Sequence, residues 1–187
     1  LQNMKNNLSA DYVLDNDIDA TPTEDWNGGQ GFEPIGNSSN PFSGSFDGQN
    51  HKIINLYISR SIDNVGLLGY VITSKEIKNV KLENCDITGN SKVGALIGTI
   101  YNSSGKISNC SSSGVISGKY RVGGLIGRVN KCTCEISNCY SSANVSGSDY
   151  YVGGLIGDLF NYDYPNYNGP VKNCYATGNV SGRSVVG

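Results

Sequence analysis

The chain has 187 residues, of which 25 are glycine and 16% are charged, and its formal net charge is −2. Ordinary globular chains hold about 7% glycine and about 25% charged residues, so this composition is typical of a chain that turns often. The small net charge excludes an electrostatic footprint for nucleic acid or an anionic membrane, and no apolar run approaches the ~20 residues of a membrane-spanning helix. We therefore expect no nucleic-acid partner and no membrane insertion in this segment.

The first 52 residues precede the regular part of the chain. Leu1, Met4 and Leu8 would lie on one face of two helical turns, and we expect this segment to cap the structure that follows, because an open sheet edge must be covered. Residues 20–52 are the least regular. Their aromatic and proline residues are expected to pack the loop against the cap rather than to form a binding platform: Trp26, Phe32, Pro34, Pro41, Phe42 and Phe46.

Residues 12–19 predict the first strand, and three acids occur in it at every second position. Asp15, Asp17 and Asp19 share one face if this strand is fully extended, which suggests a calcium site, because hard cations take clustered oxygen ligands. The alternative is a solvated strand face whose acidic end turns into the next loop. We favour the alternative because the loop spacing of an EF-hand is absent. Apart from this possible calcium ion, the sequence predicts no cofactor.

The chain is organised around one glycine phrase that is written four times. Its closing glycines, Gly69, Gly98, Gly127 and Gly157, lie 29, 29 and 30 residues apart. A period of this size indicates a repeat architecture. The four copies are Val65-Gly66-Leu67-Leu68-Gly69, Val93-Gly94-Ala95-Leu96-Ile97-Gly98, Val122-Gly123-Gly124-Leu125-Ile126-Gly127 and Val152-Gly153-Gly154-Leu155-Ile156-Gly157, and a further copy begins at Val186-Gly187.

A second phrase lies between the glycine phrases. It consists of a large apolar residue, any residue, asparagine and then another apolar residue. Aligning its copies gives an apolar column, Ile53, Ile77, Ile107, Ile136 and Val171, and an asparagine column, Asn55, Asn79, Asn109, Asn138 and Asn173. A third column is Ile87, Ile116, Val145 and Val180. The alternation predicts strands, and the asparagines are expected to hydrogen-bond along the stack as structural residues.

These columns predict an all-β fold, a parallel β-helix (β-solenoid) of about five coils of ~30 residues with a short N-terminal cap. Each coil is expected to hold two or three short strands separated by glycine-marked corners, and right-handedness is the prior for parallel crossovers. We treat residues 1–187 as one domain, with the cap, first strand and long loop in 1–52 and the repeats in 53–187. Because the chain stops two residues into a repeat, we expect it to be part of a longer repeat protein.

The phrases Gly124-Leu125-Ile126-Gly127 and Gly154-Leu155-Ile156-Gly157 resemble the GLUG motif of large bacterial and archaeal surface proteins, among them some immunoglobulin A peptidases and adhesin-like proteins. The chain departs from the motif at residues 65–69, where the phrase is one residue short, and at Ala95, which replaces a glycine. The resemblance implies a cell-surface or extracellular location and a scaffold or adhesion role, and it supplies no catalytic residues. The opening resembles the segment that precedes such repeats, in Tyr12-Val13-Leu14, Asp17-Ile18-Asp19, Trp26, Pro34-Ile35-Gly36, Pro41-Phe42-Ser43-Gly44 and Phe46-Asp47-Gly48.

Histidine and cysteine offer no catalytic constellation. His51 is the only histidine, so zinc-protease and histidine-based nucleophile systems lack partners, and we interpret His51 as a surface turn residue. Free thiols are expected throughout. Cys110, Cys139 and Cys174 are expected to form a core column that continues from Leu56 and Val80. Cys85 is alone in its repeat, and Cys132 and Cys134 lie at a corner.

Two kinds of residue keep a ligand or an enzyme under consideration. Carbohydrate-active β-helices need clustered carboxylates on one outward face, and the candidates here are Asp15 to Asp19 or Asp158 with Asp163, although the acids form no column. Tyrosine offers flat apolar area with a polar tip, and Tyr162, Tyr164 and Tyr167 fill an insertion that we regard as a candidate ligand contact. Six Asn-x-Ser sequons, at Asn7, Asn37, Asn102, Asn109, Asn144 and Asn179, leave glycosylation open, since about four would arise by chance.

The sequence therefore predicts a non-catalytic stalk or adhesive scaffold, with a carbohydrate-active β-helix or a glycan-binding module as the alternative. The expected partners are a glycan or protein on a host or neighbouring cell, or neighbouring copies or domains of the same surface protein.

Overall fold

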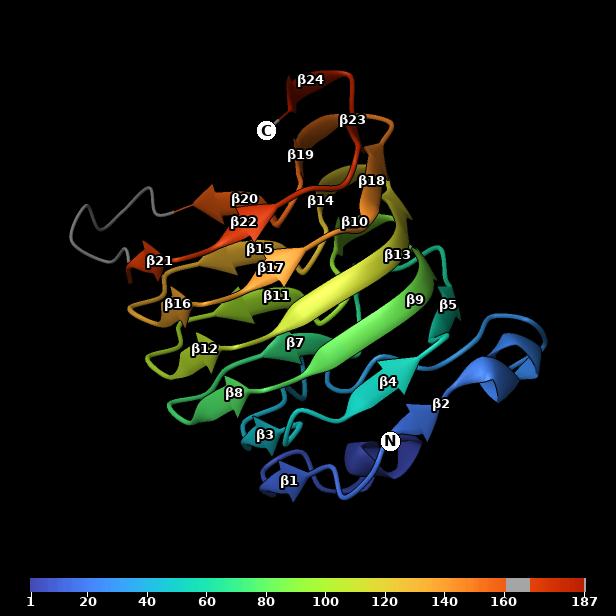
Figure 1. Cartoon of the computed structure of the whole chain (residues 1–187), viewed down its shortest axis with the longest axis vertical. Helices are drawn as coiled ribbons and strands as arrows, with labels where there is room; N and C mark the ends of the chain where they lie inside the picture. The colour runs from blue at the N-terminus through green and yellow to red at the C-terminus, as the bar shows by residue number, and fades with distance from the viewer. Residues whose placement is uncertain (161–168, 187) are drawn as a thin grey trace.

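The computed structural model describes residues 1–160 and 169–186. The chain winds into an all-β solenoid whose paired strands are parallel and belong to four sheets, here called sheets A to D (Figure 1). Within a coil the chain passes from sheet A to sheet B, then to D and C, before it returns to A one level higher. The predicted parallel β-solenoid is confirmed.

Sheets A and B contain the strands that the asparagine phrases flank. Sheet A contains β1 (Tyr12–Val13), β3 (Phe46–Asp47), β8 (Glu76–Lys78), β12 (Lys106–Ser108), β16 (Glu135–Ser137) and β21 (Val171–Lys172). Sheet B contains β2 (Ile18–Asp19), β4 (Lys52–Ile54), β5 (Tyr57–Ser59), β9 (Lys81–Thr88), β13 (Ser111–Gly118), β17 (Tyr140–Ser141), β18 (Asn144–Gly147), β22 (Tyr175–Ala176) and β23 (Val180–Ser181).

Sheets C and D contain the strands that the glycine phrases join. Sheet C contains β7 (Leu68–Val71), β11 (Ile97–Tyr101), β15 (Ile126–Asn130) and β20 (Ile156–Phe160). Sheet D contains β6 (Asp63–Val65), β10 (Ser91–Val93), β14 (Tyr120–Gly123), β19 (Tyr150–Gly153) and β24 (Ser184–Val186).

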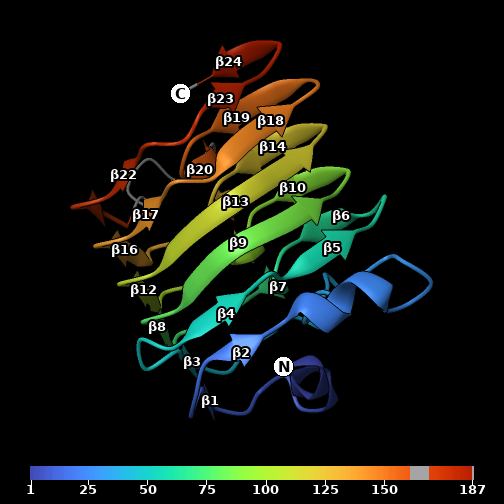
Figure 2. The ribbon, with the colours of Figure 1, turned by 45° about the vertical axis from the view of Figure 1, so that its right-hand side comes forward.

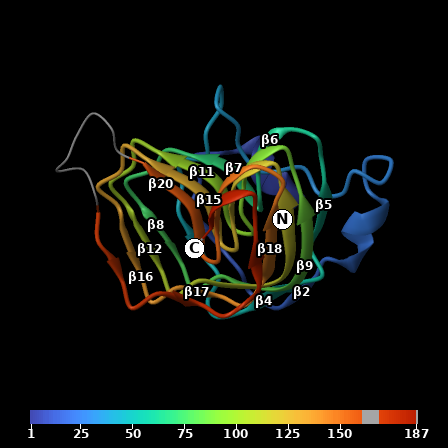
Figure 3. The same ribbon diagram turned by 90° about the horizontal axis from the view of Figure 1, so that it is seen from above.

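The coil is right-handed. Figure 1 shows the chain climbing from the N-terminus at the bottom to the C-terminus at the top, while the front strands β9 and β13 rise from lower left to upper right. Figure 2 shows sheet B as a ladder, and Figure 3 shows the coils superimposed around one interior. The solenoid has about four turns, slightly fewer than the five expected, because sheet C holds only four of the described strands.

The interior is built from the predicted columns, except at Val171 and Ile53. Val171 pairs in register with Ile136 but is 41% exposed in the last described coil. Ile77, Ile107 and Ile136 pair in register in sheet A and are at most 1% exposed. Ile53 does not belong to this column: it pairs with Leu82 in sheet B, and Phe46 takes its place opposite Ile77. The third column, Ile87, Ile116, Val145 and Val180, is confirmed and also includes Ile58.

The error at Ile53 has a physical reason, because asparagine marks two different corners of the coil. Asn79, Asn109, Asn138 and Asn173 turn the chain from sheet A into sheet B with φ between 52° and 56°. Asn55 instead aligns with Asn84 at a bend within sheet B, where Asn84 Nδ2 donates to Asn55 Oδ1 at 2.7 Å. For the same reason Leu56 aligns with Cys85 in the next coil and does not belong to the column that contains Val80.

Asparagine rather than glycine therefore marks these corners, because its short polar side chain tolerates a positive φ. The predicted hydrogen bonding along the stack is confirmed for two pairs: Asn109 Nδ2 donates to Asn79 Oδ1 at 3.1 Å, and Asn173 Nδ2 donates to Asn138 Oδ1 at 3.2 Å. Asn109, Asn138 and Asn173 are exposed and Asn79 is half-buried, so the paired side chains run along the outside of the corner.

We expect Asn109→Ala to cost about 1–2 kcal/mol, because alanine loses the bond to Asn79 and must adopt a φ of 54°. Asn109→Gly loses the same bond but accepts the angle, so it should cost less. Urea unfolding of both variants checks this difference, and equal losses would contradict the role given to the backbone angle.

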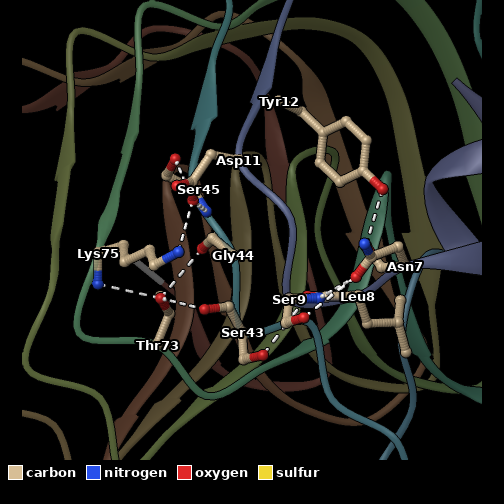
Figure 4. A network of polar contacts seen from close by, with 10 residues as sticks. All are labelled: Asn7, Leu8, Ser9, Asp11, Tyr12, Ser43, Gly44, Ser45, Thr73 and Lys75. Atoms are coloured by element: carbon tan, nitrogen blue, oxygen red, sulfur yellow. Dashed lines mark hydrogen bonds and ion pairs between the residues drawn. The ribbon is translucent and has the colours of Figure 1, made fainter.

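The N-terminal cap forms as predicted, although its helix η1 (Gln2–Asn6) is a 3-10 helix. Met4 is buried, and the segment after the helix is tied to the loop that precedes β3 (Figure 4). There Ser43 N and Gly44 N donate to Leu8 O at 2.8 and 3.0 Å, and Asp11 Oδ1 accepts from Lys75 Nζ at 2.7 Å. The cap is thus bonded to the first and second coils.

The loop between β2 and β3 also contains the 3-10 helix η2 (Thr21–Asp25). Phe32, Phe42 and Phe46 in and after this loop are at most 1% exposed, which supports their predicted packing role. Trp26 is the exception, with 39% of its surface exposed.

Candidate functional site

The outer face of sheet C gathers aromatic and charged side chains in register. Tyr70, Thr99, Arg128 and Asp158 occupy one column of paired positions across β7, β11, β15 and β20. The next position along these strands is an interior column that includes Val71, Ile100 and Val129, all buried. Because successive side chains of a strand point to opposite faces, the Tyr70–Asp158 column faces outward.

Sheet D continues this face around the corner of the coil. Asn64, Lys92, Arg121 and Tyr151 each lie just before a glycine phrase and have φ between 57° and 62°. We use the name aromatic–arginine surface for the following set, which joins both sheets: Tyr70, Tyr101, Tyr120, Arg121, Arg128, Tyr151, Asp158 and Phe160.

Asp158 is the electrostatic centre of the aromatic–arginine surface. Its side chain is only 7% exposed, and its Oδ2 atom accepts a hydrogen bond from Arg121 Nε at 2.8 Å. Arg128 Nε lies 3.2 Å from the same oxygen as an ion pair, but among the described residues its N–H has no hydrogen-bond partner of good geometry. Two cations thus share one buried carboxylate, so Arg121, Arg128 and Asp158 together carry one positive charge.

The guanidinium groups also contact aromatic rings. Arg121 lies between two tyrosines, 5.2 Å from the ring centre of Tyr120 and 5.4 Å from that of Tyr151, and Arg128 lies 5.6 Å from the ring centre of Phe160. Such cation–π contacts are worth about 0.5–2 kcal/mol each and hold the planar groups against the surface. The arrangement is therefore preorganised by contacts on several sides.

Partial burial shifts two pKa values in the aromatic–arginine surface. The pKa of Tyr70 is raised, first by burial and then by the neighbouring Tyr101, whose ring centre is 6.2 Å away. Burial and the nearby Arg121 lower the pKa of Arg128, which nevertheless stays charged because a guanidinium loses its proton only far above neutral pH. At neutral pH the surface thus presents the neutral phenol of Tyr70 beside the fixed cation of Arg128, a combination suited to stacking and to anion recognition.

The three acids considered for calcium do not share a strand face. The expected single strand 12–19 is wrong, because β1 pairs in sheet A and β2 in sheet B, with the chain turning between them. Asp17 Oδ1 accepts from Lys52 N at 2.9 Å and lies 3.2 Å from His51 Nδ1, while Asp19 Oδ1 accepts from Thr21 Oγ1 at 2.6 Å. Asp15 is exposed.

These hydrogen bonds explain the protonation behaviour of the two acids. The bond from Lys52 N lowers the pKa of Asp17, and the bond from the Thr21 hydroxyl lowers that of Asp19. Their oxygens therefore serve the local turns. In the part of the chain that the structure describes, no three His, Cys, Asp or Glu side chains are grouped so that they could hold a metal.

The predicted ligand tyrosines Tyr162, Tyr164 and Tyr167 lie outside the described residues, as does Asp163. The insertion that holds them begins directly after Phe160, a member of the aromatic–arginine surface. Of the other tyrosines, Tyr140 and Tyr175 stack on sheet B with ring centres 5.3 Å apart and planes 6° apart.

The six cysteines are free thiols, and all but Cys174 are buried. Cys110, Cys139 and Cys174 form the predicted column, in line with Val80 of the preceding coil, as their backbone pairing shows. Cys110 and Cys139 lie in the core, whereas Cys174 is half-buried. Burial raises the pKa of Cys85 to about 12, so this thiol stays protonated and unreactive at neutral pH.

Sequence reasoning did not single out Arg121 and Arg128, although the sequence did contain a signal for the ion pair between Arg128 and Asp158. These two residues directly follow the closing glycines Gly127 and Gly157, so opposite charges occupy the same position in consecutive coils. In a parallel in-register stack these positions must be adjacent, and the structure pairs them.

In residues 1–160 and 169–186 the two helices are short 3-10 segments, and neither is long and apolar enough to cross a membrane.

Comparison with known proteins finds the GLUG motif in part of the repeats. The model of "The GLUG motif" matches residues 118–146 and 148–181. Halomucin of Haloquadratum walsbyi is 41% identical over 126 residues, and a "Putative Gly-rich membrane protein" of Evansella cellulosilytica is 37% identical over 117 residues. These matches cover 63% and 59% of this chain but 1% and 13% of the relatives, so the chain spans a small part of either protein.

A crystal structure from Bacteroides ovatus, described as a "putative immunoglobulin A1 protease", has a similar fold. The two structures superpose with a TM-score of 0.59 over 100% of this chain and 81% of the other. With 18% sequence identity, this likeness shows the shared fold alone.

Proposed function

We propose that this GLUG-motif repeat chain is a non-catalytic module of a cell-surface or extracellular protein, where it acts as an extended stalk or adhesive scaffold. The stacked coils support the stalk role, because each coil adds length and repeats the same side surface without requiring a cleft. The names of the two relatives, a halomucin and a Gly-rich membrane protein, support the surface location.

The observation that carries the adhesive role is the aromatic–arginine surface. Tyr151 and Phe160 are each 42% exposed, so flat rings stand open to solvent beside the two guanidinium groups. Rings of this kind stack on sugar faces or on protein side chains, and guanidinium groups bind carboxylates in a fixed geometry. The expected partner is a glycan or protein on a host or neighbouring cell, or a neighbouring copy or domain of the same surface protein.

The acids of the repeats support a non-catalytic reading. Asp158 is held between two arginines, which engage its Oδ2 atom within the aromatic–arginine surface. Hydrogen bonds from Lys106, Ser137 and Lys172 lower the pKa of Glu135 to about 2, far from the value that a general acid needs.

We expect wild-type protein to bind a subset of ligands on a glycan and host-protein array, and Tyr151→Asn to lose at least tenfold in affinity. Asparagine is suited to this site, because Tyr151 has a φ of 62° and Asn64 occupies the same corner position three coils earlier in the stack. The matched control is Tyr140→Asn, which removes a tyrosine of similar exposure, 39%, from sheet B.

A second variant replaces Tyr162, Tyr164 and Tyr167 with serine, which tests the ligand contacts predicted from the sequence. The array is run with and without calcium, and bound polysaccharides are assayed for cleavage. Cleavage that disappears in Asp158→Asn would overturn the scaffold proposal in favour of a carbohydrate-active β-helix. Equal losses in Tyr151→Asn and Tyr140→Asn would remove the aromatic–arginine surface from the proposal.

A further inference from the structure

The six Asn-x-Ser sequons differ in how the fold presents them. Attachment of a glycan requires an exposed asparagine whose Nδ2 is free to react and a hydroxyl, two residues later, that can reach the same amide. In an extended strand the side chains of residues i and i+2 are about 6.6 Å apart along the strand, so a sequon in a strand holds its two groups apart. A sequon in a tight turn can bring them together.

The repeat sequons do not meet these requirements. Asn109 Nδ2 is already donated to Asn79 Oδ1 in the asparagine ladder. Asn144 lies in β18, with its Oδ1 accepting from Asn179 N at 3.1 Å, and the Ser146 hydroxyl shares a hydrogen bond of 3.0 Å with the Ser117 hydroxyl. Asn179 precedes β23 in the same register.

Two further sequons lack the contact between amide and hydroxyl. Asn37 turns the loop before β3 through Oδ1, which accepts from Ser39 N at 3.0 Å and Asn40 N at 2.9 Å, but within the described part of the chain the Ser39 hydroxyl makes no bond to it. Asn102 is exposed at a corner with a φ of 45°, and in the described residues Ser104 bonds to Thr73 through its backbone instead.

Asn7 is the sequon that meets both requirements. It is exposed directly after η1, and its Oδ1 atom accepts from Ser9 N at 3.3 Å and from Ser9 Oγ at 3.1 Å (Figure 4). Its Nδ2 atom makes no hydrogen bond within the described residues. The amide nitrogen is therefore open to solvent while the hydroxyl of the sequon already contacts the amide.

The turn that presents Asn7 is held on both sides. Tyr12 Oη donates to Asn7 O at 2.7 Å, and the intervening Leu8 accepts at its carbonyl from Ser43 N at 2.8 Å (Figure 4). A surface hollow of about 810 Å³ opens beside the turn, lined by residues 5–9 of the cap and by parts of the loop 33–43. The first sugars attached at Asn7 would have room there.

We propose that Asn7 is a site of N-linked glycosylation. In the reaction, Asn7 Nδ2 attacks C1 of a sugar carried on a polyprenyl phosphate lipid, and a C–N bond replaces the C1–O bond to phosphate. The lipid phosphate leaves with the bonding electron pair, and the amide proton passes to a base of the transferase. Hydrogen bonds to Oδ1 from Ser9 favour this step, because they draw electrons toward oxygen and make the Nδ2 proton easier to lose.

The test incubates the purified, folded chain with an archaeal oligosaccharyltransferase and a lipid-linked oligosaccharide. Cleavage before Asp11 separates the peptide that contains Asn7 from the one that contains Asn37, and mass spectrometry measures the glycan on each. We expect Asn7 to carry at least ten times the occupancy of Asn144 and Asn179. Asn7→Gln and Ser9→Ala should abolish the modification, while Ser9→Thr should retain it and Ser181→Ala should leave it unchanged.

A chain that is unfolded by Ile107→Asp supplies the structural comparison. If the fold selects the acceptor, the strand sequons Asn144 and Asn179 should be modified in this variant and protected in the parent. Equal occupancy of these sites in the folded parent, or no glycan at Asn7, would overturn the proposal. The same peptides from the chain exported by an archaeal host must carry the glycan on Asn7, and its absence there would also count against the site. Neither result alters the array test of the aromatic–arginine surface.

Discussion

Ile107→Asp is expected to leave the chain unfolded at 25 °C, with a loss of about 4 kcal/mol or more in the free energy of unfolding. Ile107 is 1% exposed and pairs on both sides, with Ile77 and Ile136, in the middle of the sheet A stack. A carboxylate placed there would have no cation or donor within the apolar column, and burial of an unpaired charge is among the most costly changes in a core. Circular dichroism and urea unfolding measure the effect.

The control for this prediction places one residue type on the two faces of the same coil. Ile107→Asn should unfold the chain, because it buries an amide without partners. Val115→Asn should change the free energy of unfolding by less than about 1 kcal/mol, since Val115 is 47% exposed and the next coil carries Asn144 at the paired position. If Ile107→Asp melts with the parent, the assignment of Ile107 to the interior is wrong.

The repeating part of the fold could be predicted because a solenoid converts sequence period directly into contact. Residues one period apart, such as Ile107 and Ile136, must stack when every coil has the same path. The predicted columns were wrong where the path of the chain differs between coils. Ile53 was assigned to sheet A because one asparagine phrase serves two corners, and which corner it forms depends on the long loop that precedes it.

The candidate site could be predicted only in part, because it depends on side-chain direction. Tyr120 and Tyr151 come just before two of the glycine phrases, and both belong to the aromatic–arginine surface. The pairing of Arg121 with Asp158 joins a corner residue of one coil to a strand residue of the next, so it follows from the angle of the corner rather than from the period. The common strand face from which the calcium hypothesis was argued does not form, because a corner separates β1 from β2.

Gly127→Ala is expected to cost about 3 kcal/mol or more, which tests why the closing glycine recurs in every coil. A Cβ atom on Gly127 would lie 2.5 Å from Val93 N and 2.6 Å from Gly98 O in the preceding coil. These are backbone atoms of paired strands, so they cannot move without breaking the stack. The glycine is therefore required for close approach of two coils rather than for a positive φ.

Gly154→Ala is the matched control, because it adds the same methyl group to the last glycine phrase. There the new Cβ would meet side-chain atoms, Ala176 Cβ at 2.7 Å and Val180 Cγ2 at 3.4 Å, and both belong to the last described coil, where Ala176 is exposed. The chain already carries Ala95 at the equivalent position of an earlier coil. Thermal unfolding should therefore show a small decrease in melting temperature for Gly154→Ala and a large one for Gly127→Ala. Comparable decreases would mean that backbone contact between coils is not the reason why the closing position must be glycine.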